Sequence, residues 1–303
     1  MEANVTVFMQ ILPIVLFVAL GYGFKVLKRD ISKELVDFVM HFSLPAIAIV
    51  QIHKMEFNEA VMGVVWIAYA AMGMASVVSY VIGRFFGLNR KDLATLMVVV
   101  IFGNTSFVGL SYIEALYSKN EIVYGLVYDQ VGTFIALLTF GVVIISWGGG
   151  HGDRPKALAK KIFFSPPLVA IIAAFFLRDV TFPVAIMQVL EKLEVTLIPL
   201  VTMIVGMKLE FKAMAKELKL TTVAISLKLM AIPALMLLCV YPFVDMGQTW
   251  AQVTILEVAM PTMTMATVFA IEGGLNRHLA INTLGLGIVM SFLSVPFWNF
   301  VLS

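Results

Sequence analysis

The sequence has little charge and almost no cysteine. Only 13% of its 303 residues are Asp, Glu, Lys or Arg, and the formal net charge is +2. Soluble domains carry about 25% charged residues, because their surfaces face water. A nearly neutral chain lacks the basic surface that attracts phosphates, so no nucleic-acid partner is expected. The single cysteine, Cys239, excludes an internal disulfide and a cysteine-based zinc cluster.

Apolar residues, by contrast, dominate the composition. They make up 61% of the chain, and the mean hydropathy is +0.98. A soluble protein is about 45–50% apolar, because water-facing residues must still cover its core. The sequence therefore predicts an integral membrane protein whose main surroundings are lipid.

Apolar runs of span length recur along the whole chain. A helix needs about 20 apolar residues to cross the roughly 30 Å hydrocarbon core of a bilayer. Cutting the sequence at charged and turn-forming residues predicts an all-α integral membrane protein with ten transmembrane helices, joined by short connections. The predicted helices cover residues 6–27, 34–53, 60–86, 92–117, 122–147, 162–178, 184–208, 220–243, 250–272 and 277–301.

The basic residues alternate between the connections. Sixteen of the 21 Lys and Arg residues lie in connections after odd-numbered helices, and three lie in the opposite connections. Positive charge concentrates on the cytoplasmic side of membrane proteins. We therefore expect a multi-pass protein of the cell membrane (inner or plasma membrane) with both termini outside the cytoplasm.

The chain also divides into two similar halves. A Gly-rich, basic linker at residues 148–161, expected in the cytoplasm, separates five helices in residues 1–147 from five in residues 162–303. Because five is odd, the second set enters the membrane with opposite polarity, and such inverted repeats are typical of secondary transporters. A shift of 154 residues aligns Leu44-Pro45 and Lys54-Met55-Glu56-Phe57 with Ile198-Pro199 and Lys208-Leu209-Glu210-Phe211.

Predicted helices four and nine are interrupted near their centres. Helix four contains Gly103 and Gly109 around small polar residues, and helix nine contains Pro261, which removes a backbone donor. Matching interruptions in two repeats are the best sequence pointer to a transporter site. A simple kink, with Ser and Thr bonding back to the helix, is the alternative.

The interruptions predict where a substrate binds. Backbone groups opened within a membrane must face protein, water or a ligand, and the N-terminus of each second half-helix favours an anion. We therefore predict a small organic anion as the partner, bound where the two helices cross. The candidate substrate-binding residues are Asn104, Thr105, Ser106, Phe107, Pro261, Thr262 and Thr264.

An ionisable residue inside a predicted transmembrane helix raises the free energy of membrane insertion by about 2.5–3.5 kcal/mol, so each one is expected to have a function or a structural partner. Glu257 ends a half-helix at its negative C-terminus, which suits a bound proton or Na⁺, with a structural pair to a lysine as the alternative. Asp129 and Gln130 join either this ion-coupling site or a structural polar network. Lys228 either attracts the substrate anion or pairs with Glu257 or Asp129. No cofactor or metal is expected besides a coupling H⁺ or Na⁺.

A second set of intramembrane charges lies in predicted helix seven. Glu191, Lys192 and Glu194 are close in sequence. Side chains on one helix face can pair with each other. We expect these residues to pair along the helix, with a structural or gate-lining role.

Several motifs resemble those of the auxin efflux carrier family. The N-terminal region of that family is similar to Leu12-Pro13-Ile14, Gly21-Tyr22-Gly23 and Phe42-Ser43-Leu44-Pro45-Ala46. Residues 103–110 resemble its fourth-helix signature, and Glu257-Val258-Ala259-Met260-Pro261 resembles its ninth-helix signature. The resemblance covers the chain end to end. It implies a ten-helix fold like that of bile acid:sodium symporters, in which helices four and nine cross in a core that moves against a scaffold.

The resemblance also implies transport of organic anions, such as auxin in plants and dicarboxylates in bacteria, and a homodimer like that of plant members. This chain departs from the family at Ser106, where Gly is frequent, and at Ser111, where Pro is frequent. The Asn-Pro-Asn-x-Tyr pattern of plant carriers is missing from the sequence, which argues against auxin. Without the proline, the break in helix four depends on its glycines.

Together these features predict a secondary active transporter of small mono- or dicarboxylates. It is expected to work by alternating access, as an efflux carrier or coupled to H⁺ or Na⁺. Three alternatives remain: a ligand-binding sensor on a transporter fold, a membrane-embedded enzyme and a channel. The HExxH and paired-Asp metal motifs are missing from the sequence, so an enzyme is not expected.

Overall fold

The computed structural model describes residues 2–54, 59–149, 166–177, 180–209 and 217–303, and these are almost entirely helical. Most of the predicted linker at residues 148–161 lies outside them. So do much of the repeated Lys-x-Glu-Phe tetrapeptides and several of the basic residues that predict the orientation.

Five stretches of the described residues are long and apolar enough to cross a membrane. They are Ser32–His53, Glu59–Phe85, Lys119–Gly149, Leu218–Val240 and Arg277–Leu302. They coincide with predicted helices two, three, five, eight and ten, so the all-helical membrane fold is confirmed. Helices four and nine are divided into short pieces, and the count of ten inverted-repeat spans stays a prediction.

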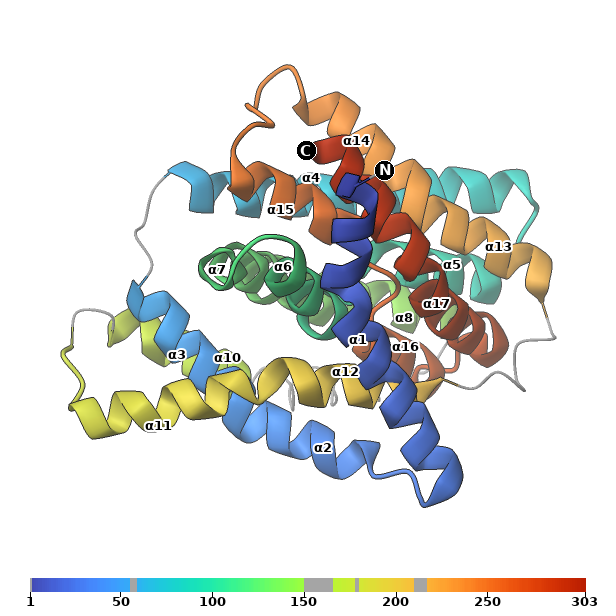
Figure 1. The fold of residues 1–303 in the computed structure, drawn as a ribbon. Helices are drawn as coiled ribbons and strands as arrows, with labels where there is room; N and C mark the ends of the chain where they lie inside the picture. Colours follow the sequence, from blue (N-terminus) through green and yellow to red (C-terminus); the bar gives the residue numbers. More distant parts are fainter. Residues whose placement is uncertain (1, 55–58, 150–165, 178–179, 210–216) are drawn as a thin grey trace.

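One group of helices, called the panel here, comes from the start and the middle of the chain. Figure 1 shows α2, α3, α10, α11 and α12 gathered below the other helices, with α1 crossing in front. A π-helical turn at Val39–Ser43 joins α2 to α3, and Thr196 separates α11 from α12. The panel contains α1 (Glu2–Leu27), α2 (Ser32–Phe38), α3 (Leu44–Lys54), α10 (Pro166–Phe176), α11 (Val184–Val195) and α12 (Leu197–Lys208).

Helices α1 and α12 are held together by a close backbone approach. A Cβ added at Gly21 would overlap the backbone of Met203, and one added at Gly206 would overlap the backbone of Val18. Small residues allow such approaches between helices in membranes, where packing replaces the hydrophobic effect. The two glycines therefore fix how the panel is assembled.

The remaining helices form a second group, called the crossing bundle here. All buried members of the largest apolar cluster belong to it, whereas two smaller clusters join it to the panel. The bundle contains α4 (Glu59–Phe85), α5 (Arg90–Ile101), α6 (Leu110–Leu116), α7 (Ile122–Val127), α8 (Val142–Gly149), α13 (Leu218–Ser226), α14 (Ile232–Val240), α15 (Thr249–Val258), α16 (Thr264–Glu272) and α17 (Arg277–Leu302). Its other turns are π-helical at Thr105–Gly109, Tyr128–Phe134, Leu137–Gly141 and Leu227–Ala231, and 3₁₀ at Lys119–Glu121.

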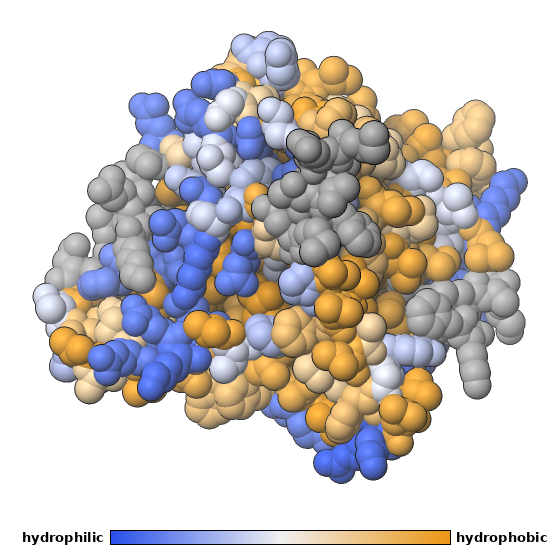
Figure 2. Space-filling view, viewed as in Figure 1, coloured by the Kyte–Doolittle hydropathy of each residue, from blue (hydrophilic) through white to orange (hydrophobic). Residues whose placement is uncertain are grey.

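The outer surface is strongly apolar. Figure 2 shows broad hydrophobic areas on one face, broken by hydrophilic groups. Trp66, Phe176 and Leu238 are 71%, 84% and 71% exposed. Contiguous apolar surface of this kind is rare on soluble monomers and suits contact with lipid.

Candidate functional site

Predicted helix four is broken at Asn104. Helix α5 ends at Ile101, Phe102 is extended, and a helical turn resumes at Thr105. The Asn104 side-chain oxygen accepts a hydrogen bond from the Phe107 N–H at 3.3 Å, which caps the second half-helix. The Asn104 carbonyl accepts further bonds from Val108 and Gly109. A side-chain cap at Asn104 therefore sets the break, in addition to the glycines around it.

Predicted helix nine is broken in the same way. Helix α15 ends at Val258, and α16 begins at Thr264 after an extended Met263. Pro261 lies inside this gap. Proline cannot donate the bond that would continue a helix. The predicted interruption of both helices is confirmed.

The two breaks cross and share their backbone hydrogen bonds. The Asn104 N–H donates to the Pro261 carbonyl at 2.6 Å, and the Met263 N–H donates to the Phe102 carbonyl at 2.9 Å. Gly103 and Thr262 thereby face each other as an antiparallel bridge. The opened backbone groups partner each other instead of lipid, as a membrane requires. Both segments are therefore true breaks rather than simple kinks.

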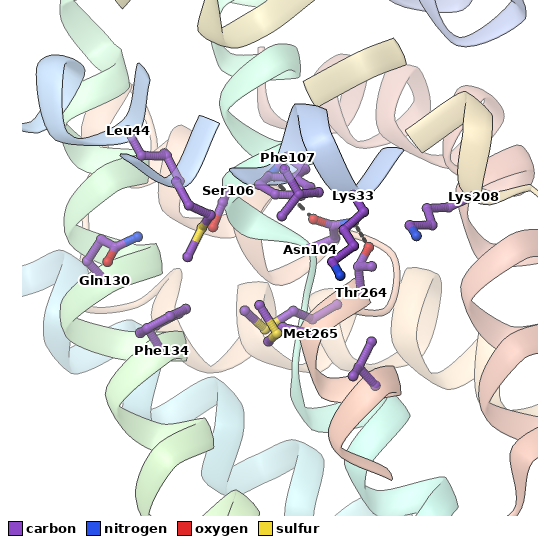
Figure 3. A pocket seen from close by; sticks show the side chains of 14 residues that line it. Lys33, Leu44, Asn104, Ser106, Phe107, Gln130, Phe134, Lys208, Thr264 and Met265 are labelled. Carbon is purple, nitrogen blue, oxygen red and sulfur yellow. Dashed lines mark hydrogen bonds between the residues drawn. The ribbon is translucent and has the colours of Figure 1, made fainter. Parts of the chain in front are cut away.

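A cavity of about 190 Å³ lies beside the crossing. Figure 3 shows Asn104, Ser106, Phe107, Gln130 and Thr264 on its wall. The Asn104 amide donates a hydrogen bond to the Thr264 hydroxyl at 3.2 Å, so the two broken helices meet at the cavity. Five of the predicted site residues are thus brought together.

Three predicted substrate-binding residues are not on the cavity wall. The Thr105 hydroxyl donates to Asp129, and the Thr262 hydroxyl donates to the Val99 carbonyl at 2.8 Å. Pro261 offers its carbonyl to Asn104. These residues hold the crossing together, and their place in the structure does not put them in contact with a ligand in the cavity.

The charged residues on the cavity wall come from the panel. Lys33 lies at the start of α2 and Lys208 at the end of α12, and both side chains are exposed. Lys228, which the sequence suggested as the electrostatic residue, is only 4% exposed and does not line the cavity. Its ammonium group donates to the Val258 carbonyl at 3.4 Å behind the crossing.

Asp129 lies in the π-helical turn Tyr128–Phe134 of predicted helix five, beside the start of the second half of helix four. It is fully buried, accepts the Thr105 hydroxyl and accepts a 2.5 Å hydrogen bond from the Gln130 side chain. A carboxylate at this position complements the positive end of a helix. Asp129 therefore forms the polar network that the sequence offered as one interpretation, and its carboxylate already occupies part of the half-helix N-terminus.

Glu257 is buried in a gap left by two glycines. Its side chain is 1% exposed, and a Cβ at Gly109 or Gly125 would overlap its carboxylate. Among the described residues neither carboxylate oxygen has a hydrogen-bond partner. Lys228 and Asp129 are the charged groups that interact with it electrostatically. A buried carboxylate without a direct partner is costly when ionised, so this position suits a proton or a bound cation.

A family described as "Membrane transport protein" matches residues 6–157 and 154–299. The chain belongs to this membrane transport protein family. The match covers nearly the whole sequence and confirms the resemblance to auxin efflux carriers. The family is one of membrane transporters, so the predicted assignment to a transporter rather than to an enzyme class is supported.

Two relatives of this membrane transport protein carry only general descriptions. An "Uncharacterized transporter" of Methanothermobacter thermautotrophicus is 24% identical over 299 residues, covering 96% of this chain and 97% of the relative. "Uncharacterized transporter MJ1031" of Methanocaldococcus jannaschii is 23% identical over 304 residues, again covering 96% and 97%. The similarity spans whole chains and supports a common transporter architecture.

In this membrane transport protein, the sequence alone did not indicate that Lys33 and Lys208 line the site. They had contributed only to the charge count that predicts the orientation. Each borders an apolar stretch, Lys33 before one and Lys208 at the end of one, which is a signal for a membrane boundary rather than for a cavity. As for metals, the described residues contain no group of three His, Cys, Asp or Glu side chains that could hold an ion.

Proposed function

We propose that this protein is a secondary carrier that moves an organic anion across the membrane by alternating access. The observation that carries the proposal is the cavity at the crossing, where an amide, a hydroxyl and two ammonium groups meet. Binding sites at paired broken helices are typical of such carriers. Asn104 and Thr264 would hold the anion directly, and Lys33 and Lys208 would attract it.

The cavity wall favours an anion with an apolar body. Eight of its 14 lining residues are hydrophobic, and Lys33, Asn104 and Thr264 form one polar region of the wall (Figure 3). A carboxylate could lie at that polar region while a hydrocarbon or aromatic body fills the rest, since ligand sites combine apolar walls with a few polar groups. The apolar lining residues are Val36, Met40, Leu44, Phe107, Phe134, Met263, Met265 and Val268.

Glu257 is the proposed residue that couples anion transport to a cation. A proton or Na⁺ would neutralise this buried carboxylate, and the cation would then travel with the crossing bundle. The alternative driving force is the membrane potential, which supplies about 2.3 kcal/mol per charge per 100 mV to an anion moving outward. Both versions use the same anion site and differ only in whether Glu257 binds the cation.

The distribution of basic residues in the sequence indicates how the proposed carrier is oriented in the membrane. Lys33 and Lys208 belong to the basic side, so the cavity faces the cytoplasm and both termini lie outside. The two broken helices support an inverted repeat, because α5 and α15 end at Ile101 and Val258, 157 residues apart and close to the repeat shift. The proposed carrier has ten transmembrane helices. The proposed homodimer rests only on the family resemblance.

A thermal-shift screen followed by a flux assay tests the proposal. Purified protein is heated with aliphatic and aromatic monocarboxylates and with dicarboxylates, and the stabilising acids are then tested for uptake into proteoliposomes. We expect monocarboxylates with apolar bodies to raise Tm, and Asn104→Ala to reduce the apparent affinity about tenfold, because a hydrogen bond to a charged group contributes about 1.5–3 kcal/mol. Asn299→Ala, the same exchange near the C-terminus, should change nothing.

Three other results would each contradict part of the proposed function. Stabilisation by dicarboxylates alone would contradict the apolar-body substrate. Binding of an acid without flux would favour the sensor alternative. Unchanged affinity in Asn104→Ala would remove the crossing from the binding site.

A further inference from the structure

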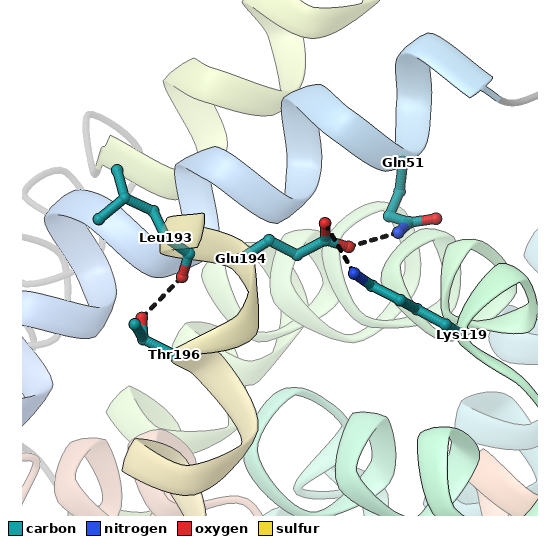
Figure 4. A network of polar contacts seen from close by, with 5 residues as sticks. All are labelled: Gln51, Lys119, Leu193, Glu194 and Thr196. Atoms are coloured by element: carbon teal, nitrogen blue, oxygen red, sulfur yellow. Dashed lines mark hydrogen bonds and ion pairs between the residues drawn. The ribbon is translucent and has the colours of Figure 1, made fainter. Parts of the chain in front are cut away.

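A buried acidic residue joins the two groups of helices far from the cavity. The Glu194 side chain is 1% exposed and pairs with the ammonium group of Lys119 at 3.1 Å. The Gln51 amide donates to its other oxygen at 2.5 Å. Figure 4 shows the three side chains directed at one another. Glu194 thus pairs across the molecule, instead of with Glu191 and Lys192 as the sequence suggested.

The three residues belong to both groups of helices, the panel and the crossing bundle. Gln51 lies on α3 and Glu194 on α11, both in the panel. Lys119 lies in the 3₁₀ turn between α6 and α7 of the crossing bundle. The ion pair is therefore a contact between groups, and any movement of the bundle against the panel must lengthen or break it.

The cluster lies well away from the cavity lysines along the panel helices. Gln51 follows Lys33 by 18 residues along one helical stretch, and Glu194 precedes Lys208 by 14 residues along α11 and α12. At 1.5 Å per residue these separations are roughly 27 and 21 Å, most of the thickness of a membrane. The cavity lysines and the ion pair are therefore separated by much of the thickness of a membrane.

We propose that Lys119, Glu194 and Gln51 form the gate that closes the far side of the carrier while the cavity is open at the Lys33 and Lys208 side. This inference rests on the proposed function. In each cycle the Lys119–Glu194 pair separates, water enters between the groups, and the site becomes accessible from the far side.

The chemistry of the cluster suits a contact that forms and breaks repeatedly. Glu194 stays on the panel with Gln51, so its carboxylate keeps one hydrogen bond when Lys119 leaves. Lys119 is already 44% exposed and can return to water. Glu114, on the same bundle, interacts electrostatically with both Lys119 and Glu194, so Lys119 retains a nearby acidic group after separation.

The panel side of the gate has a fixed support. The Thr196 hydroxyl donates to the Leu193 carbonyl at 2.6 Å and shares a 2.7 Å hydrogen bond with the Ser43 hydroxyl. These contacts connect α11 and α12 to the π-helical turn before α3. Movement is therefore concentrated at the Lys119 contact rather than within the panel.

The test measures which side of the carrier is open. A Cys239→Ala background removes the natural thiol, and Met265→Cys places a reporter on the cavity wall. In inside-out membrane vesicles, a membrane-impermeant maleimide labels the reporter when the cavity is open to the cytoplasmic side. We expect Lys119→Gln to lower the labelling rate about five- to tenfold, because loss of the gate shifts the population towards the other state.

Matched variants separate the gate from a general loss of charge or stability. Lys192→Gln removes the same charge from α11 close to Glu194 and should leave the labelling rate unchanged. The charge exchange Lys119→Glu with Glu194→Lys should restore most of the labelling rate. A short bifunctional thiol reagent joining Lys119→Cys to Glu194→Cys should stop substrate exchange, and reduction should restore it.

The results distinguish the gate from the proposed function. If the protein carries out anion flux and Lys119→Gln labels like the parent, the gate is wrong. If labelling shifts as expected but no carboxylate is carried, the gate stands as a contact that controls opening, and the proposed function fails. If the thiol cross-link leaves flux unchanged, the pair does not separate during transport and the gate is wrong.

Discussion

Glu257 combines deep burial with oxygens that accept no hydrogen bond among the described residues. The sequence predicted its importance because an acidic residue within an apolar helix is costly without a purpose. The sequence could not predict its surroundings, because Gly109 and Gly125 come from two other segments. Lys228 shows the same limit: its position in an apolar helix is evident, but only the packing reveals that it lies behind the crossing and away from the cavity.

Replacing Glu257 with glutamine tests its coupling role. Glutamine has nearly the same shape and no charge, so a carboxylate that is neutral at rest should be replaced without loss of thermal stability. We expect Glu257→Gln to bind the anion but to lose the dependence of uptake on a proton or Na⁺ gradient, measured in proteoliposomes. Glu272→Gln, at the exposed end of α16, is the control. Gradient-dependent uptake that survives in Glu257→Gln would assign coupling elsewhere.

Among the elements, the broken helices were the most predictable. The breaks could be predicted from Gly103 and Pro261, because both residue types disfavour a continuous helix. The π-helical turns that carry Ser106, Asp129 and Lys228 were not predicted, since an extra residue in a turn leaves no compositional signal. Such turns are frequent at functional sites. Here each one carries a polar side chain that lies next to the crossing.

The packing of α1 on α12 gives a prediction for one element pair. Gly21→Ala places a methyl group against the backbone of Met203, which has no side-chain freedom with which to yield. We expect a loss of about 1–3 kcal/mol in stability, as for other overpacked positions, seen as a lower Tm in detergent. Gly23→Ala in the same helix has open space around it and should preserve Tm. Equal Tm values for the two variants would show that the close approach is not required.

At the scale of the whole molecule, the sequence predicted the helical fold of a membrane protein and the breaks in two of its helices. It did not predict which side chains from the panel reach the bundle. Lys33 and Lys208 share the cavity with Asn104 of the bundle, and Glu194 pairs with Lys119. In each case the bundle residue is more than 50 residues away along the chain. These contacts depend on how two separately packed groups meet. The charge pattern of one helix carries no information about that arrangement.

The two cavity lysines give a prediction at this scale. Neutralising Lys33 or Lys208 removes positive potential from the cavity mouth, so anion affinity should fall several-fold, and its sensitivity to salt should also fall because less charge remains to be screened. Binding titrations at low and high ionic strength measure both effects. Lys219→Gln, at the start of α13 on the same basic side, is the control. Unchanged affinity in both cavity variants would exclude an electrostatic role.

The shared backbone bonds between the two broken helices have a consequence for the empty carrier. Because Asn104 and Met263 each donate an amide hydrogen to the other broken helix, these two groups have hydrogen-bond partners without any cargo. In the proposed transport cycle, these amides would need no cargo as a hydrogen-bond partner on the return step. In the proposed carrier, net movement of cargo would therefore not require one-for-one exchange.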